Sequence, residues 1–327
     1  MYRGCWAPVR GRPTSGVQSV AGSVASAWRR IRSDFLMPSR LPLYAQLLGA
    51  AAAQRYAVVS IEHFWQSITS GSVDAQRRYL VLRHDVDTDP GTARRMFEIE
   101  QAIGISSSSY YFRLATADID LMRAIVAQGG EVGYHFEELA AVAKRHRLRT
   151  PAQARMHLPE ARELFRNHIR DLRARTGLPM RIVAAHGDFA NRLLGVTNCE
   201  ILADPVFRRD VGIDLEVYDR AFMQHVTSRH SDMAPPRYWA PSDPLPALAR
   251  GEPVVYLLVH PRHWHAARGA NAVDDLRRVC EGVAYQWRVP SRAARPARPL
   301  LHPLPHPAVE REPADHLDAP KSGTTVR

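Results

Sequence analysis

The chain has 327 residues, of which 45% are hydrophobic and 24% are charged. No stretch approaches the roughly 18 uninterrupted apolar residues that a membrane-spanning helix needs, and three cysteines are too few for a disulfide-stapled scaffold. The net charge of +11 is concentrated at the ends, since residues 1–33 contain six Arg and no acid, and residues 290–327 carry +2. Residues 34–289 therefore carry only +3, which argues against a nucleic-acid-binding surface.

The two ends of the chain have compositions typical of unfolded segments. Residues 1–34 combine scattered Arg with a run of Ser, Gly and Ala that polar residues interrupt too often for a signal peptide. Residues 290–327 contain eight prolines mixed with Arg, Ala and His. We expect a disordered basic leader at 1–34, one α/β domain at 35–289 and a disordered Pro/Arg-rich tail at 290–327.

The apolar pattern of the middle region alternates between strand and helix periods. Short β-branched or aromatic runs predict seven buried strands, at residues 79–83, 108–112, 131–134, 181–185, 200–203, 213–217 and 254–259. Helical periodicity predicts helices at residues 91–102, 119–128 and 150–176. Thr150-Pro151 is a suitable start for the last helix, and Gly177 is a suitable stop. Alternating strands and helices predict a parallel sheet, and about 250 residues is a size at which α/β barrels are common.

Four of the predicted strands are each followed directly by a histidine, and two of these histidines have carboxylates close by. The residues are His84, Asp85, Asp87, His135, Glu137, Glu138, His186 and His260. In parallel α/β folds, functional side chains lie at the carboxyl ends of the strands, so we expect these residues to converge. Two or three nitrogen and oxygen ligands with one open position form a catalytic divalent metal site. The sequence therefore predicts a metal site at this end of the sheet.

The run Asp85-Val86-Asp87 has a second interpretation. A strand followed by D-x-D is also typical of glycosyltransferases that bind a nucleotide sugar through a divalent cation, because both carboxylates can face one metal–diphosphate group. A divalent-cation-dependent sugar-nucleotide glycosyltransferase is therefore an alternative function for the chain.

Five motifs in this order resemble those of a known family: Leu82-Arg-His-Asp-Val-Asp87, Ser-Ser-Tyr-Tyr-Phe-Arg113, Gly130-Glu-Val-Gly-Tyr-His135, Ala185-His-Gly187 and Leu257-Leu-Val-His-Pro261. Over roughly residues 40–265 the chain resembles the polysaccharide deacetylase family, also called the NodB-homology or carbohydrate esterase 4 group. It looks closest to the R-H-D-V-D branch. The resemblance implies a distorted (β/α)7 barrel and a metal-dependent hydrolase that removes an N-acyl group, acetyl or formyl, from a sugar or glycolipid in surface-polysaccharide metabolism.

The resemblance also implies roles for individual residues. The general base of the family falls on Asp85 and its general acid on His260, while its first metal histidine falls on His135. The second, metal-binding Asp of the family falls on Val86, so we expect Asp87 to replace it.

The family's second metal histidine falls on Leu139 in this sequence, so that ligand is missing. We expect Glu138, Glu137 or His186 to replace it, with a divalent metal, zinc in the first place, as the cofactor. The missing histidine leaves a third function open, a non-catalytic relative that binds glycan.

A sugar substrate needs an apolar platform and hydrogen-bonding groups. We expect Tyr111, Phe136 and Trp264 to supply the platform, and Arg113 and Arg262 to hold a phosphate or uronate. The expected partner is a carbohydrate or lipid-linked sugar, with no nucleic acid and no transmembrane segment. We expect a cytoplasmic protein and leave open both a peripheral association with the inner membrane surface and the oligomeric state.

Overall fold

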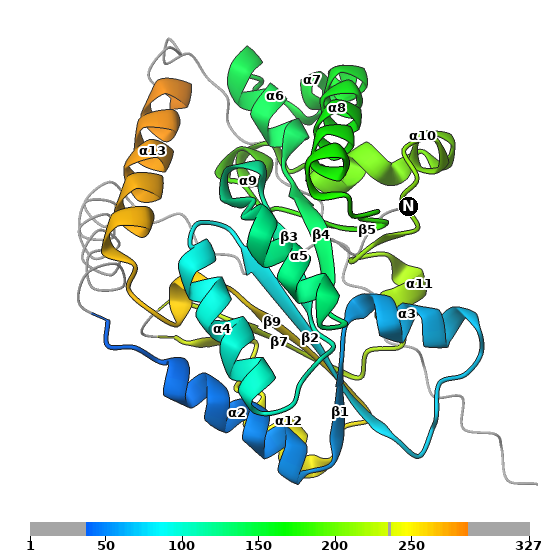
Figure 1. The fold of residues 1–327 in the computed structure, drawn as a ribbon. Coiled ribbons are helices and arrows are strands. Elements are labelled where there is room, and N and C mark those ends of the chain that lie inside the picture. Colours follow the sequence, from blue (N-terminus) through cyan, green and yellow to red (C-terminus); the bar gives the residue numbers. More distant parts are fainter. Residues whose placement is uncertain (1–36, 235–236, 287–327) are drawn as a thin grey trace, which may run out of the picture. The chain divides into compact units, whose positions relative to one another are not determined.

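The computed structural model describes residues 37–234 and 237–286, which form one nine-stranded sheet with helices around it (Figure 1). The strands are β1 (Tyr56–Val59), β2 (Arg78–Val86), β3 (Ser109–Phe112), β4 (Glu131–Phe136), β5 (Ile182–Ala185), β6 (Leu215–Glu216), β7 (Ser228–Asp232), β8 (Trp239–Ala240) and β9 (Val254–Val259). Their order is β6-β5-β4-β3-β2-β9-β7-β8, with β1 paired to β2. All pairs are parallel except β7 with β8.

β2 is the central strand of the sheet. β9 lies along residues 79–84 of β2, while β1 lies beside residues 78–81 and β3 beside residues 83–86. β1 and β3 therefore share the edge of β2 that β9 does not use. The sheet curls into a half-barrel, and within the described residues no pairing joins β6 to β8.

The helices cover the outside of the half-barrel and part of its interior. They are α2 (Leu41–Ala53), α3 (Ile61–Thr69), α4 (Pro90–Ala102), α5 (Ile119–Ala127), α6 (Glu138–His146), α7 (Pro151–Met156), α8 (Leu158–Thr176), α9 (Phe189–Leu194), α10 (Pro205–Asp210), α11 (Arg220–Met223), α12 (Leu245–Arg250) and α13 (Arg268–Gln286). Outside the sheet, α4, α5, α6 and α8 pack on one apolar cluster, and α2 and α12 on another. A third cluster, which includes residues of α3 and α11, fills the inside.

The alternation of side chains along β2 directs its polar residues inward at the end of the strand. Tyr79 and Val81 belong to the inner cluster, whereas Leu80 and Leu82 face α2 and α12. Because successive strand residues point to opposite faces, Arg83 and Asp85 continue the inner row, and His84 points outward. The outward His84 contacts the hydroxyl of Tyr44 in α2.

Most of the predicted strands are present, but the segment at residues 200–203 is not one of them. It lies in a 3₁₀ helix, Asn198–Ala203, in which Ile201 and Leu202 are buried in the outer cluster. A short apolar run does not by itself distinguish a strand from a buried helical turn. β1, β7 and β8 were not predicted. The residues of β7 read Ser-Arg-His-Ser-Asp, without the apolar run that marks a buried strand.

The predicted helices are present, and that at residues 150–176 is divided in two. Thr150 caps α7 and Gly177 ends α8 in the left-handed conformation at φ 74°, as the sequence predicts. His157 separates the two helices, with a proline in the first turn of α8. The expected leader at 1–34 and tail at 290–327 lie outside the described residues.

The fold is thus α/β, with a curled and mostly parallel sheet. Among the described helices, none combines the length and apolar character required to cross a membrane.

Gly133 in β4 is a position where the packing of the half-barrel can be tested. A Cβ there would lie 2.4 Å from the carbonyl oxygen of Ile182 and 2.4 Å from the ring of Tyr111. We expect Gly133→Ala to lower the free energy of unfolding by about 2–3 kcal/mol, measured by urea denaturation. The control is Gly49→Ala in α2, which has open space around it and should be neutral or stabilising by about 0.5–1 kcal/mol. Equal stability of the two variants would contradict this packing.

Candidate metal centre and active site

The carboxyl ends of β2, β4, β5 and β9 bring their polar side chains together. Asp85 lies near the end of β2 and Asp87 just beyond it; His135 is in β4, His186 follows β5, and His260 follows β9. The Nε2 atom of His135 lies 3.4 Å from Asp85 Oδ2 and 3.3 Å from Asp87 Oδ1. His260 Nε2 lies 4.0 Å from Asp85 Oδ2. Five of the predicted side chains therefore share one site, in which Asp85, His135 and His186 are buried and Asp87 and His260 are partly buried.

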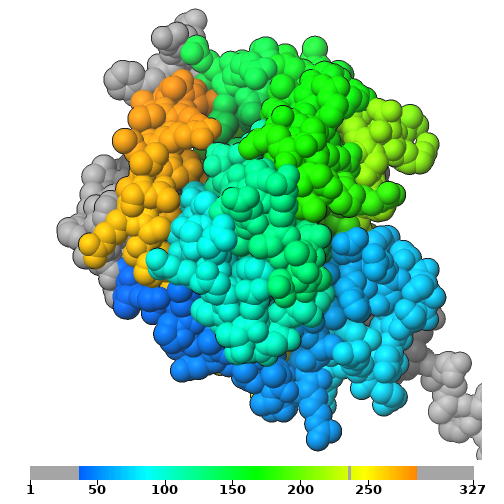
Figure 2. Space-filling model, viewed as in Figure 1, coloured from blue at the N-terminus to red at the C-terminus, as the bar shows by residue number. Residues whose placement is uncertain are grey.

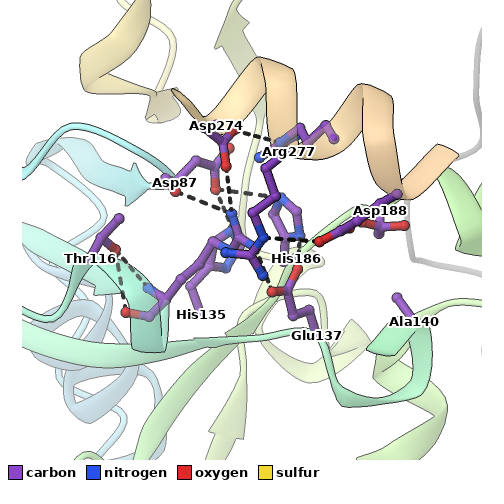
Figure 3. A network of polar contacts seen from close by, with 12 residues as sticks. Asp87, Thr116, His135, Glu137, Ala140, His186, Asp188, Asp274 and Arg277 are labelled. Carbon is purple, nitrogen blue, oxygen red and sulfur yellow. Dashed lines mark hydrogen bonds and ion pairs between the residues drawn. The ribbon is translucent and has the colours of Figure 1, made fainter. Parts of the chain in front are cut away.

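Asp87, His135 and His186 form a candidate metal-binding group, the metal group, whose ligand atoms all lie within 4.8 Å of one another (Figure 3). His186 Nε2 lies 3.6 Å from Asp87 Oδ1, on which His135 Nε2 also converges. The other ring nitrogens are engaged elsewhere: His135 Nδ1 donates to the carbonyl of Ala184 at 3.0 Å, and His186 Nδ1 lies 3.1 Å from Glu137 Oε2. Partners on Nδ1 orient a histidine so that Nε2 can bind a metal.

The chemistry of this group fits a divalent transition metal. Asp87 Oδ1 is buried and has no hydrogen-bond partner among the described residues. Burial alone raises the pKa of Asp87, but His186 and His135 offset it and hold that pKa well below its usual range. An ionised carboxylate and two imidazole Nε2 atoms on one point are ligands typical of zinc.

Asp85 is held by an arginine that the sequence analysis did not single out. Arg83 donates from Nε to Asp85 Oδ1 and from Nη2 to Oδ2, both at 2.7 Å. Burial raises the pKa of Asp85, and the charges of Arg83, His135 and His260 more than offset it, so that the pKa is lowered. Asp85 is therefore ionised at neutral pH.

His260 is paired with a negatively charged residue, whereas Asp85 is paired with a positively charged one. Its Nδ1 lies 2.6 Å from Asp232 Oδ1, and its backbone N–H donates to Asp232 Oδ2 at 2.8 Å. Burial lowers the pKa of His260, but Asp232 outweighs burial and raises the pKa to about 9. His260 is therefore protonated at neutral pH. Asp232 was not predicted, because it ends β7, which the sequence did not reveal.

Glu138, expected as a metal ligand, lies apart from the metal group. It accepts from the hydroxyl of Tyr134 at 2.5 Å and lies 2.9 Å from His168 Nδ1 of α8. Its neighbour Glu137 contacts His186 instead. The prediction that Glu138 is a metal ligand is therefore wrong. Glu137 and Glu138 are consecutive residues at the start of α6, and their side chains point in different directions.

The prediction that Tyr111, Phe136 and Trp264 form an aromatic platform for the sugar is also wrong. The side chains of Tyr111, Phe136 and Trp264 are at most 1% exposed. Tyr111 donates to Glu131 inside the half-barrel, Phe136 packs in the outer core, and Trp264 donates to Asp232 at 2.7 Å. These rings are structural, since a buried ring cannot stack on a sugar.

The two arginines expected to hold an anion lie at the rim of the metal group. Arg113 donates to Glu137 at 2.5 Å and to the carbonyl of Asp87 at 3.2 Å. Arg262 donates to Asp275 of α13 at 3.1 Å. His84, the remaining strand-end histidine, is on the outer face and pairs with Glu100 at 3.0 Å.

Comparisons of this chain with protein-family models, with curated proteins and with solved structures found no match.

The metal group predicts the metal content of the purified protein. We expect about one equivalent of Zn²⁺ per chain after loading and dialysis, and loss of the metal in Asp87→Ala, His135→Ala and His186→Ala, because each removes one ligand. Glu138→Gln is the matched control and should retain the metal. The measurement is elemental mass spectrometry, and full retention of zinc in His186→Ala would contradict this ligand set.

Proposed function

We propose that the chain is a metal-dependent hydrolase that removes an N-acyl group, acetyl or formyl, from a sugar or glycolipid of surface-polysaccharide metabolism. We further propose that its half-barrel is the distorted (β/α)7 barrel of the polysaccharide deacetylase type, in a cytoplasmic protein. One observation carries the proposal: the carboxylate of Asp85, paired with Arg83, and the imidazole of His260, paired with Asp232, lie 4.0 Å apart beside the group of Asp87, His135 and His186.

Amide hydrolysis requires a base for the attacking water and an acid for the departing amine. Asp87, His135 and His186 would hold a divalent ion, which would supply acidification of water and polarisation of the acyl oxygen. Asp85, kept ionised by Arg83, is placed to accept the proton of the water through a carboxylate oxygen. His260, kept protonated by Asp232, is placed to donate the proton of Nε2 to the nitrogen of the amine.

The roles of the two carboxylates favour hydrolysis over sugar transfer. In a D-x-D transferase both carboxylates face one metal–diphosphate group. Here both oxygens of Asp85 accept from Arg83, and only Asp87 belongs to the metal group. This separation supports different tasks for Asp85 and Asp87.

The test of the proposed activity is release of acetate or formate from a panel of N-acetylated and N-formylated amino sugars by the zinc-loaded protein. We expect Asp85→Asn and His260→Gln each to lower kcat by about 10²–10⁴-fold, because each removes one proton-transfer group. Both variants should retain zinc, which separates loss of chemistry from loss of the metal. A panel that yields no product, or an Asp85→Asn variant with full activity, would refute the hydrolase and favour a glycan-binding barrel.

The raised pKa of His260 predicts the alkaline side of the pH profile. Because the acid must carry its proton, kcat/KM should fall tenfold per pH unit above about pH 9. Asp232→Asn removes the charge that raises this pKa, so the fall should begin at least one pH unit lower. The measurement is kcat/KM from pH 6 to 10 for both proteins. An unchanged profile in Asp232→Asn would rule out His260 as the acid.

A further inference from the structure

α13 presents its polar face to the rest of the protein. The polar or aromatic residues that are buried or partly buried lie on one side of the helix: Asn271, Asp274, Asp275, Arg278, Glu281 and Tyr285. Two small residues, Ala272 and Gly282, are also partly buried. The aliphatic residues of the helix are 45–69% exposed: Val273, Leu276, Val279 and Val283. Figure 2 shows α13 on the surface of the molecule. An apolar stripe normally holds a surface helix to the core, whereas α13 turns its stripe away.

Polar contacts hold α13 in place along its length. Asn271 accepts from Thr88 Oγ1 at 3.2 Å near the start of the helix, and Glu281 lies 2.8 Å from Lys144 Nζ further along. Near its end, the hydroxyl of Tyr285 donates to the carbonyl of Leu148. Asn271 and Tyr285 are buried, so the two ends of α13 are held more firmly than its middle. The middle is held by partly exposed ion pairs, which contribute about 0–1 kcal/mol each, and side chains there can change partners at low cost.

The carboxylate of Asp274 in α13 lies beside the site. Its Oδ1 lies 3.7 Å from Arg113 Nη1, and its Oδ2 lies 3.5 Å from Arg262 Nη1. Arg113 Nη1 also donates to the carbonyl of Asp87, so the Asp274 carboxylate lies next to the metal group (Figure 3). Its Oδ2 also pairs with Arg278 Nε of the same helix at 2.6 Å. The carboxylate of Asp274 therefore lies between Arg278 of α13 and two guanidinium groups from different strand ends, those of Arg113 and Arg262.

We propose that the position between Arg113 and Arg262 binds an oxyanion group of the substrate, a phosphate or a carboxylate beside the reacting sugar. Asp274 occupies this position while α13 is closed, and the substrate anion displaces it. The inference deepens the proposed function and rests on it, since it names the substrate class for the same site.

The contacts of Arg113 suit an exchange of partners. Its Nη2 is fixed by Glu137 at 2.5 Å, while its Nε is buried and makes no hydrogen bond within the described residues. Asp274 makes its close ion pair, at 2.6 Å, with Arg278 of its own helix, whereas its 3.7 Å and 3.5 Å separations from Arg113 and Arg262 exceed those of direct charge-assisted hydrogen bonds. A planar guanidinium binds phosphate or carboxylate oxygens through two parallel N–H groups, which a tetrahedral or planar anion can use better than this aspartate does.

The experiment measures anion binding without turnover, on the full-length chain, by calorimetric titration with inorganic phosphate and with glucuronate. Asp274→Asn removes the competing carboxylate and should bind phosphate, glucuronate or both about 10-fold more tightly than the wild type. Arg262→Gln added to Asp274→Asn should abolish this gain. The anion that the variant binds more tightly, phosphate or glucuronate, shows whether the oxyanion group of the substrate is a phosphate or a carboxylate. Unchanged affinity for both anions in a folded Asp274→Asn protein, or a gain that survives Arg262→Gln, would overturn the inference.

Two further variants serve as controls for this experiment. The gain should persist when Asp274→Asn is combined with His135→Ala, which separates it from phosphate bound to a metal; a gain lost there would overturn the inference. Glu281→Gln loosens α13 at Lys144 without touching the anion position, and should tighten anion binding about 3-fold. If Asp274→Asn does not fold, no tightening in Glu281→Gln would count against the inference.

The outcomes also separate this inference from the proposed function. Hydrolysis of neutral N-acyl sugars without any gain in anion affinity would contradict the oxyanion position alone. The expected gain in anion affinity without release of any acyl group would contradict the hydrolase alone.

Discussion

The buried pair of Arg83 and Asp85 is the interaction on which the site depends. Charges removed from water are stable only when they are paired and hydrogen-bonded. Arg83 is fully buried, yet it donates twice to Asp85 and once to the hydroxyl of Tyr256 in β9. The two residues can meet because positions two apart on a strand lie on the same face. β2 can therefore hold an ionised carboxylate inside the half-barrel, at the end where β4, β5 and β9 add their histidines.

The need to pair every buried charge also explains why the proposed carboxylate base and imidazolium acid can lie so close together in the site. Asp85 has Arg83, and His260 has Asp232, so in both groups the charged partner outweighs the effect of burial, which favours the neutral form. The two environments push the two pKa values apart, which is the condition for a base and an acid to work at one pH. Asp232 also accepts from Trp264, so the ring expected to bind sugar instead fixes the partner of the acid.

The sequence predicted the strand ends well and the supporting residues poorly. Apolar runs marked β2, β4, β5 and β9, and the residues at and after their ends included Asp87, His135 and His186. The same set contained His84, which points outward, and the choice of Asp87 and His186 as ligands came from the family resemblance. Asp232 was missed because β7 is polar along its whole length and carries no periodic signal. Glu138 and Glu137 were both candidate ligands, because spacing cannot tell which of two adjacent residues faces a site. The burial of Trp264 depends on contacts distant in sequence, which composition does not encode.

In the proposed hydrolase, His186 would replace the one ligand of the family motif that this sequence lacks. The motif places its second metal histidine at Leu139, but that residue is fully buried in the outer core against the helices. His186 comes from the neighbouring strand β5, and Glu137 at the start of α6 contacts its Nδ1 and leaves Nε2 toward Asp87. In the proposed hydrolase the number and type of ligands are thus kept while one ligand moves from a helix to a strand end. The move also ties Glu137 to Arg113, and so connects the metal group to the position that Asp274 occupies.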